Sequence, residues 1–206
     1  MRLTRFALWL LAVWVAGVAM AQESPDALIR RAVDEVTTAI KADRDIQSGS
    51  RQKINLLVDT KIVPFLNFQR MTQSAVGRHW SRATPEQQQA LLREFKGLLT
   101  NTYSGAFSTY RADTVIEYKP FRMQSGDNDA VVRSLVKAGA NEPIQLDYYL
   151  ERFDSAWKVI DINVHGARLI ETYKSQFNTE ITANGIDGLI KALAAKNRSI
   201  EARSRS

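Results

Sequence analysis

Residues 129–164 decide the fold of this chain: DAVVRSLVKAGANEPIQLDYYLERFDSAWKVIDINV. Within this stretch apolar and polar residues alternate in three runs, 129–137, 144–151 and 157–164, and short turn-forming segments separate the runs. Alternation with a period of two is typical of strands that bury one face. Because the intervening segments are too short for a helix, the runs are predicted to pair as an antiparallel meander.

A fourth strand is expected just upstream of this stretch. Residues 114–118, TVIEY, show the same alternation, and Pro120 follows them. Proline cannot donate a hydrogen bond to a neighbouring strand, so the strand should end before it. The sequence therefore predicts a four-stranded antiparallel sheet with one apolar face.

Amphipathic helices are predicted on both sides of this sheet in the chain. Their apolar residues recur at spacings of three and four over 28–40, 54–62, 68–80, 91–110, 169–181 and 186–193. Asn67 is a candidate N-cap, and Thr84 to Gln87 has the pattern of a capping box with proline at the first helical position. Helices, then a sheet, then helices indicate an α+β fold in which the helices cover one sheet face.

Composition limits the classes of function that this chain can have. It has 206 residues, 28 of them Lys or Arg and 22 Asp or Glu, a formal charge of +6 and no cysteine. The lack of cysteine excludes disulfides, thiolate catalysis, cysteine zinc sites and iron–sulfur clusters. Acidic residues are interspersed with the basic ones, so no nucleic-acid partner is expected.

The first residues have the layout of a secretory signal peptide. A short basic start with Arg2 and Arg5 precedes 15 uncharged residues, 6–20, and a small-residue cleavage pattern ends at Ala21. That run is shorter than the about 20 residues that span a bilayer. We therefore expect a cleaved peptide over 1–21, a single domain over 22–196, and a frayed polar, basic tail over 197–206.

No set of residues in the sequence indicates an enzyme. Motifs for a nucleophile elbow, a zinc protease, a phosphate-binding loop and a dinucleotide fold are missing. The two histidines, His79 and His165, belong to different predicted elements. The acidic cluster at 127–129 fits a hairpin turn better than a calcium loop. No catalytic residue, metal site or cofactor is predicted, although an α+β enzyme or a chaperone that uses an apolar pocket or surface stays an alternative.

Several short segments occur in an order that resembles a known family. They are Asn67 to Met71, Val76-Gly77, Trp80, Ala83 to Gln87, Tyr103 to Phe107, Tyr110, Trp157 to Ile162, Gly166, Tyr173, Gln176-Phe177 and Gly185 to Leu189. Together with the signal peptide, they resemble the MlaC family, also called the toluene-tolerance family. These are the periplasmic phospholipid-binding proteins of the pathway that maintains lipid asymmetry (Mla).

The resemblance implies a periplasmic carrier that shuttles glycerophospholipids between the outer and inner membranes and so maintains outer-membrane asymmetry. The acyl chains would enter an apolar cavity enclosed by the sheet and the helices, and the head group would stay near solvent. The implied partners are an inner-membrane ABC transporter with an MCE-domain subunit and an outer-membrane lipoprotein–porin complex. The carrier is expected to be a monomer, with phospholipid as its cargo.

Candidate cavity residues are the apolar side chains at inward strand positions and on the facing helix stripes, and core packing explains each of them equally well. On the strands they are Val132, Leu146, Tyr148, Leu150, Ile160 and Ile162. On the helices they are Phe68, Met71, Val76, Leu99, Tyr103, Phe107, Leu169, Ile170 and Tyr173. The family tends to read acidic–Gly–apolar–Ser where this chain has His165-Gly166-Ala167-Arg168, so we expect His165 and Arg168 to form a basic head-group rim.

Overall fold

The computed structural model describes residues 23–108, 110, 113–124, 126–139, 142–154 and 156–203. The expected signal peptide, 1–21, and the last three residues of the expected tail lie outside these ranges. Within the described ranges, no helix is both long enough and apolar enough to cross a membrane.

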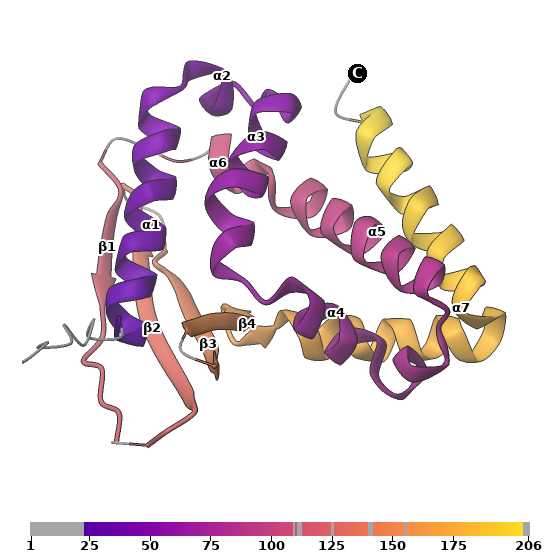
Figure 1. Cartoon of the computed structure of the whole chain (residues 1–206). Helices are drawn as coiled ribbons and strands as arrows, with labels where there is room; N and C mark the ends of the chain where they lie inside the picture. The colour runs from indigo at the N-terminus through magenta and orange to yellow at the C-terminus, as the bar shows by residue number, and fades with distance from the viewer. Residues whose placement is uncertain are drawn as a thin grey trace, which may run out of the picture.

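The sheet has five antiparallel strands in chain order (Figure 1). They are β1 (Val115–Tyr118), β2 (Asp129–Lys137), β3 (Ile144–Phe153), β4 (Ala156–Val164) and β5 (Ala167–Arg168). The first four confirm the predicted meander. The fifth was not predicted, because two residues are too few to show an alternating pattern. A turn at His165 and Gly166, both with positive φ, returns the chain so that β5 pairs with β4.

The helices before and after the sheet confirm the α+β class. They are α1 (Pro25–Ala42), α2 (Arg44–Gln47), α3 (Arg51–Leu57), η1 (Val58–Ile62), η2 (Val63–Phe65), α4 (Phe68–Val76), η3 (Gly77–Arg82), α5 (Pro85–Tyr103), α6 (Gly105–Ser108) and α7 (Leu169–Arg203). Both predicted helix starts are confirmed. The Asn67 side chain accepts a hydrogen bond from the Arg70 N–H at 3.0 Å, and Thr84 and Gln87 form a reciprocal capping box.

Three helix predictions differ from the structure. The stripe over 68–80 is divided at Gly77, where α4 ends and the 3₁₀ segment η3 begins. The apolar stripe over 91–110 does not form one helix, because α5 ends at Tyr103 and a separate turn of helix, α6, begins at Gly105, a poor helix former. The chain after Lys196 is helical through Arg203 instead of frayed. Asn197 explains this, since it is buried and its amide donates to the Glu94 carbonyl oxygen at 3.0 Å, which ties the end of α7 to α5.

The predicted break at Asn184-Gly185 is confirmed as a sharp bend within α7. Gly185 has φ 70° and ψ −179°, a conformation that glycine adopts readily because it lacks a Cβ atom. In Figure 1, α7 leaves the sheet, bends, and returns beside α5. The bend therefore lets one long segment pack on both α4 and α5.

The buried apolar residues form three separate clusters. The sheet cluster joins α1 to β2, β3 and β4 through Leu28, Ile29, Phe65 and the central strand residues. The helical cluster joins α4, α5 and α7 around Phe95. The third cluster joins the end of α1 to α2, α3 and η1. Because α1 belongs to two of the clusters, it connects the sheet to the helices that follow it.

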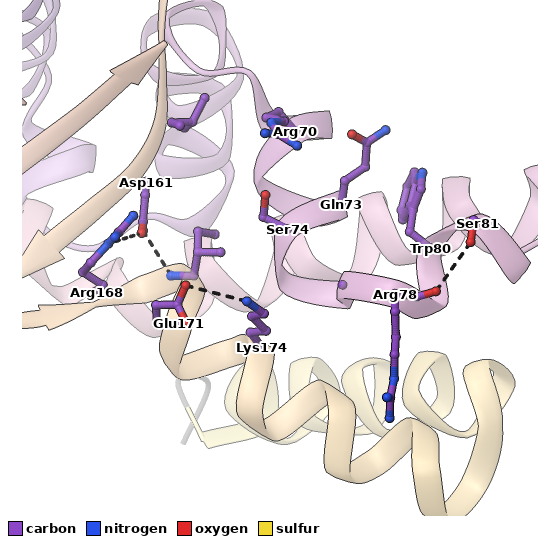
Figure 2. Close-up of a pocket in the computed structure, with 13 residues that line it drawn as sticks. Arg70, Gln73, Ser74, Arg78, Trp80, Ser81, Asp161, Arg168, Glu171 and Lys174 are labelled. Atoms are coloured by element: carbon purple, nitrogen blue, oxygen red, sulfur yellow. Dashed lines mark hydrogen bonds and ion pairs between the residues drawn. The ribbon is translucent and has the colours of Figure 1, made fainter. Parts of the chain in front are cut away.

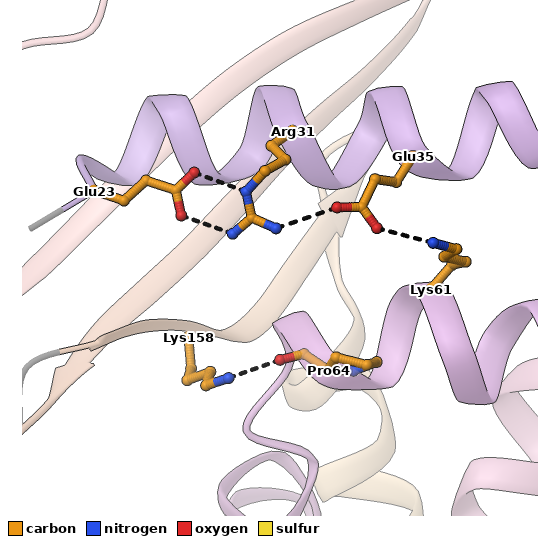
Figure 3. Close-up of polar contacts among 6 residues, drawn as sticks. All are labelled: Glu23, Arg31, Glu35, Lys61, Pro64 and Lys158. Carbon is orange, nitrogen blue, oxygen red and sulfur yellow. Dashed lines mark hydrogen bonds and ion pairs between the residues drawn. The ribbon is translucent and has the colours of Figure 1, made fainter.

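A chain of ion pairs holds α1 against η1 (Figure 3). The Arg31 guanidinium donates to Glu23 at 2.7 and 2.9 Å and to Glu35 at 3.2 Å, and the Lys61 ammonium donates to Glu35 at 3.3 Å. Beside it, the Lys158 ammonium of β4 donates to the Pro64 carbonyl oxygen at 2.7 Å. These contacts fix the first helix relative to the segment that leads into α4.

Glu35→Gln is expected to make the stability of the protein less sensitive to acid. The hydrogen bond from Lys61, and then that from Arg31, lowers the pKa of Glu35. A carboxyl whose pKa is lower in the folded state stabilises the fold above its unfolded pKa, about 4.3, and this contribution disappears as the pH falls through the folded value. Urea midpoints near neutral pH and near pH 3 measure the difference, with the exposed Glu142→Gln as the control. Equal acid sensitivity in Glu35→Gln and the unmodified protein would contradict this assignment.

Candidate functional site

The inner face of the sheet, the face that α1 covers, carries a surface that is apolar except at Ser134. The strand register places its side chains in rows that cross β2, β3 and β4: Ala130, Leu150 and Val159; then Val132, Tyr148 and Ile162; then Ser134, Leu146 and Val164; then Val136 and Ile144. The first row is buried, whereas Ile144 in the last row is 41% exposed. Ser134 in the third row is still buried, but Leu146 and Val164 beside it and Val136 in the last row are only half-buried, so the face is least covered at this end.

The uncovered end of this face is called here the open apolar strip: Val136, Ile144, Leu146 and Val164. Among the described residues, these four belong to none of the three packed clusters. They continue directly from the sheet cluster, because Leu146 follows Tyr148 on the same face of β3. Ile144 is exposed and the other three side chains are half-buried, and contiguous apolar side chains that stay accessible to solvent are a candidate binding site.

Tyr148 lies where the covered part of the face meets the open apolar strip. Burial raises the pKa of its phenol to about 12, although a hydrogen bond with Ser134 opposes this rise. The phenol therefore stays neutral at physiological pH and adds no charge to the apolar face. Of the predicted strand residues, Val132 and Leu150 are buried in the sheet cluster, and Tyr148 and Ile162 pack against it.

Ile160 does not lie on the inner face, contrary to its predicted inward position. The register of β3 and β4 shifts between Tyr149 and Leu150, so Val159 and Ile162 are the residues that pair with inner-face positions. Ile160 is the extra residue of this β-bulge, and it lines a groove elsewhere on the molecule. An alternating pattern has no feature that reveals such an inserted residue.

Most of the predicted helical candidates are packed in the helical cluster. Met71, Val76, Ile170 and Tyr173 are buried there, and Phe68 and Leu99 pack against it. Phe95 is in the centre, with ring centroids 5.0 Å from Tyr173, 5.1 Å from Phe177 and 5.8 Å from Phe68. These side chains fill one another's space, so their contact with a ligand stays a prediction.

Tyr103 and Phe107 are close in sequence but contact different clusters. Tyr103 is 37% exposed at the end of α5, and its phenol lies close to that of Tyr173 of α7. Burial raises the pKa of both phenols. Phe107 packs on the third cluster instead. Leu169, at the start of α7, is half-buried and belongs to none of the clusters described above.

A second concave surface, called here the basic groove, lies where α4, η3, β4 and the start of α7 meet (Figure 2). Its volume is about 630 Å³, and a neighbouring hollow of about 410 Å³ shares part of its lining. Four cationic side chains line the groove: Arg70, Arg78, Arg168 and Lys174. The groove has a mostly polar lining, and the smaller hollow is lined by α4, η3 and α7 without any residue of the sheet. Neither is therefore the predicted apolar cavity between sheet and helices, which stays a prediction.

Of the two predicted rim residues, only Arg168 lines this groove. Its Nε donates to the Asp161 carboxylate at 2.8 Å, and its guanidinium lies 4.2 Å from the centre of the Tyr149 ring. Asp161 is only 2% exposed, and its other oxygen accepts from the backbone N–H groups of Ile162 and Ile170. Arg168 is thus held in one orientation. His165 is exposed in the turn before β5 and is not part of the groove lining.

Asp161→Ala is expected to lower the free energy of unfolding by about 2 kcal/mol. The buried N–H of Ile170 would lose its acceptor, and an unsatisfied buried donor costs about 1–3 kcal/mol. Urea denaturation measures the change. Glu171→Ala, which removes an exposed carboxylate from the same groove, is the control and should alter stability by less than about 0.5 kcal/mol. Equal losses of stability in both variants would contradict the assignment of this stability to the hydrogen bonds that the buried Asp161 carboxylate accepts.

Sequence reasoning missed parts of both surfaces. Val136, Ile144 and Val164 continue the same alternation as Leu146, so extending that pattern to the ends of the strands would have found them. Arg70 and Arg78 carry no such signal. They lie on different helices from Lys174, and only the packing of α4 and η3 against α7 brings the three cations to one groove.

Comparisons with known proteins agree with this architecture. A family model described as MlaC protein matches residues 30–195. The intermembrane phospholipid transport system binding protein MlaC of Haemophilus influenzae is 24% identical over 186 residues, covering 88% of this chain and 86% of the relative. Toluene tolerance protein ttg2D of Pseudomonas putida is 26% identical over 170 residues, covering 82% and 78%.

A solved structure is similar over nearly its whole length. It is a phospholipid-binding protein from Ralstonia solanacearum in complex with a phospholipid. Its sequence is 46% identical to this chain, and the superposition has a TM-score of 0.82. The match covers 85% of this chain and 98% of the solved one.

Proposed function

Because this chain belongs to the MlaC family, we propose that it is a carrier that binds a phospholipid and moves it between two membranes. The phospholipid in the 46% identical Ralstonia protein supports this proposal, since that match extends over 98% of the solved chain. The relative from Haemophilus influenzae is named for intermembrane phospholipid transport, which supports the same role.

The physical reason for a carrier is the cost of exposing acyl chains to water. Two chains contain about 30 methylenes, so transfer of a lipid into bare water costs roughly 24 kcal/mol at about 0.8 kcal/mol per methylene. A protein lowers this cost if it covers the chains with apolar side chains. Such a carrier needs no covalent chemistry, so its function is binding and release rather than catalysis.

The observation that carries the proposal is the open apolar strip. It lies beside the sheet cluster on the inner face, and its side chains are partly exposed. In the proposed complex, the acyl chains cover Leu146 and its neighbours and extend toward Tyr148. Exposed Tyr103 is a candidate contact on the helical side.

The setting of this carrier is also part of the proposal. It acts in the periplasm after removal of the signal peptide. It exchanges lipid with an inner-membrane ABC transporter that has an MCE-domain subunit and with an outer-membrane lipoprotein–porin complex. The name of the Haemophilus influenzae relative, which refers to a transport system, supports the involvement of such partners.

Mass spectrometry of an organic extract of the purified protein tests the carrier function. We expect phospholipid at close to one molecule per chain. Protein that is unfolded, stripped of lipid and refolded should lack phospholipid and regain it on incubation with phospholipid vesicles. Absence of phospholipid both from the native extract and after incubation would overturn the proposal and favour a chaperone that uses its apolar surface differently.

A further inference from the structure

The basic groove collects polar and cationic side chains from three elements. Arg70 and Ser74 come from α4, Arg78 and Ser81 from η3, and Lys174 from α7. Figure 2 shows the Lys174 ammonium on the side of the groove that faces Ser74, and the Arg78 side chain extending toward α7. The groove therefore has cations on opposite walls, with the Ser74 hydroxyl facing Lys174.

Positive charge exceeds negative charge in the groove. Asp161 is already satisfied by Arg168 and by two backbone N–H groups. Glu171 lies 3.9 Å from Lys174, and both side chains are more than half exposed, so this pair neutralises Lys174 only weakly. Arg70 reaches Glu151 at 3.4 Å, at the edge of the groove.

Arg78 is the cation most available to a ligand. It is exposed, its side chain makes no ion pair or hydrogen bond with any residue in the described ranges, and it lines both the groove and the neighbouring hollow. Gly77, which precedes it, has φ 62° and is the residue at which α4 changes into η3. This change of direction places Arg78 on the groove rather than on the continuing face of α4.

Trp80 adds an amphipathic side chain to the same groove. It is half-buried, and it packs against the helical cluster while it lines the groove. Tryptophan favours positions where an apolar body contacts hydrocarbon and the indole N–H stays in a polar environment, as at the interface of a bilayer. Basic residues beside a tryptophan fit a surface that carries phosphate groups next to hydrocarbon.

We infer that the basic groove docks this protein on a membrane by binding the phosphate groups of anionic phospholipids. The inference rests on the proposed carrier function and extends it, because the groove is separate from the open apolar strip that would hold the acyl chains. Arg78 and Lys174 are the main contacts, and the Ser74 hydroxyl supplies an additional donor. Docking through the groove would hold the carrier at the lipid surface and leave the open apolar strip free to bind the acyl chains of the cargo.

Vesicle sedimentation with the full-length mature chain tests the docking surface. We expect binding to vesicles of phosphatidylglycerol mixed with phosphatidylcholine, weak binding to phosphatidylcholine alone, and a decrease as salt is added. Arg78→Gln should weaken binding to the anionic vesicles about fivefold, since one basic group near an anionic surface contributes about that factor. Arg82→Gln is the matched control: it removes the same charge from the same η3 segment, outside the groove lining, and should leave binding unchanged.

Three outcomes would overturn the docking inference. Equal weakening by Arg78→Gln and Arg82→Gln would show that net charge, and not the groove, causes the binding. Displacement from the vesicles by inorganic phosphate, beyond that by chloride at the same ionic strength, would assign the groove to free phosphate. Mass spectrometry of the Arg78→Gln extract separates this inference from the carrier function, because the variant should retain its phospholipid. If the unmodified protein contains phospholipid but does not bind anionic vesicles, the docking inference is refuted and the carrier function is not.

Discussion

Leu146→Asp is expected to remove almost all phospholipid from the purified protein while the protein stays folded. Leu146 is at the centre of the open apolar strip, paired with Ser134 and Val164, and it belongs to none of the packed clusters. A carboxylate there stays hydrated in the empty protein. Acyl chains that cover it would remove that water, which costs several kcal/mol for an unpaired charge. Each 1.4 kcal/mol weakens binding tenfold, so occupancy should fall by more than a hundredfold.

Leu135→Asp is the matched control for this experiment. Leu135 is also half-buried, but it lies on the opposite face of the sheet, next in sequence to the residue that pairs with Leu146. Lipid content is measured by mass spectrometry and folding by circular dichroism. Retention of full lipid by Leu146→Asp, or equal loss in the two variants, would show that the inner face does not hold the acyl chains.

Phe95→Ala is expected to lower the free energy of unfolding by about 3–5 kcal/mol. Its side chain is completely buried, and its ring packs edge-on against Tyr173 and Phe177 from α7. Truncation removes apolar contact and leaves a cavity among three helices that cannot close it without moving their backbones. Such a loss is a large fraction of the stability of a typical domain.

Leu92→Ala provides the comparison on the same helix. Leu92 is only half-buried, so its truncation should cost about 1 kcal/mol. Urea denaturation of both variants gives the two values. Similar losses would mean that α4, α5 and α7 are not held together by the aromatic centre of the helical cluster.

The acyl-chain site and the docking surface occupy different parts of the molecule. The open apolar strip lies at the ends of β2 and β4 and at the start of β3. The basic groove lies on the other side of β4, among α4, η3 and α7. Variants of one surface should therefore leave the other intact. This separation lets cargo binding and membrane docking be measured independently in the same protein.

Much of the local structure could be predicted because the signals were local. Capping at Asn67 and Thr84 depends on side chains within three residues of the cap, and the strand alternation depends on which residues face the core. The break between α5 and α6 and the helical end of α7 could not be predicted in this way. Phe107 packs on the third cluster, and the Asn197 amide is hydrogen-bonded to α5. Both contacts join residues that are far apart in sequence.

The candidate site divides in the same manner. The predicted face is correct for Val132, Leu146, Tyr148 and Leu150, because alternate residues of a regular strand lie on the same face of the sheet. Ile160 was misplaced because a single inserted residue at the bulge reverses that alternation.

By itself, the order of polar and apolar residues determined the α+β class and the strands of the meander, and a set of short segments in order indicated the family. These depend on periodicity and on short motifs, which a linear sequence contains in full. Only the tertiary structure decided which end of the apolar sheet face stays uncovered and which cations share a groove. Both depend on which helices pack against which parts of the sheet and of one another. These contacts join segments that are distant in the chain, so a local pattern in the sequence does not reveal them.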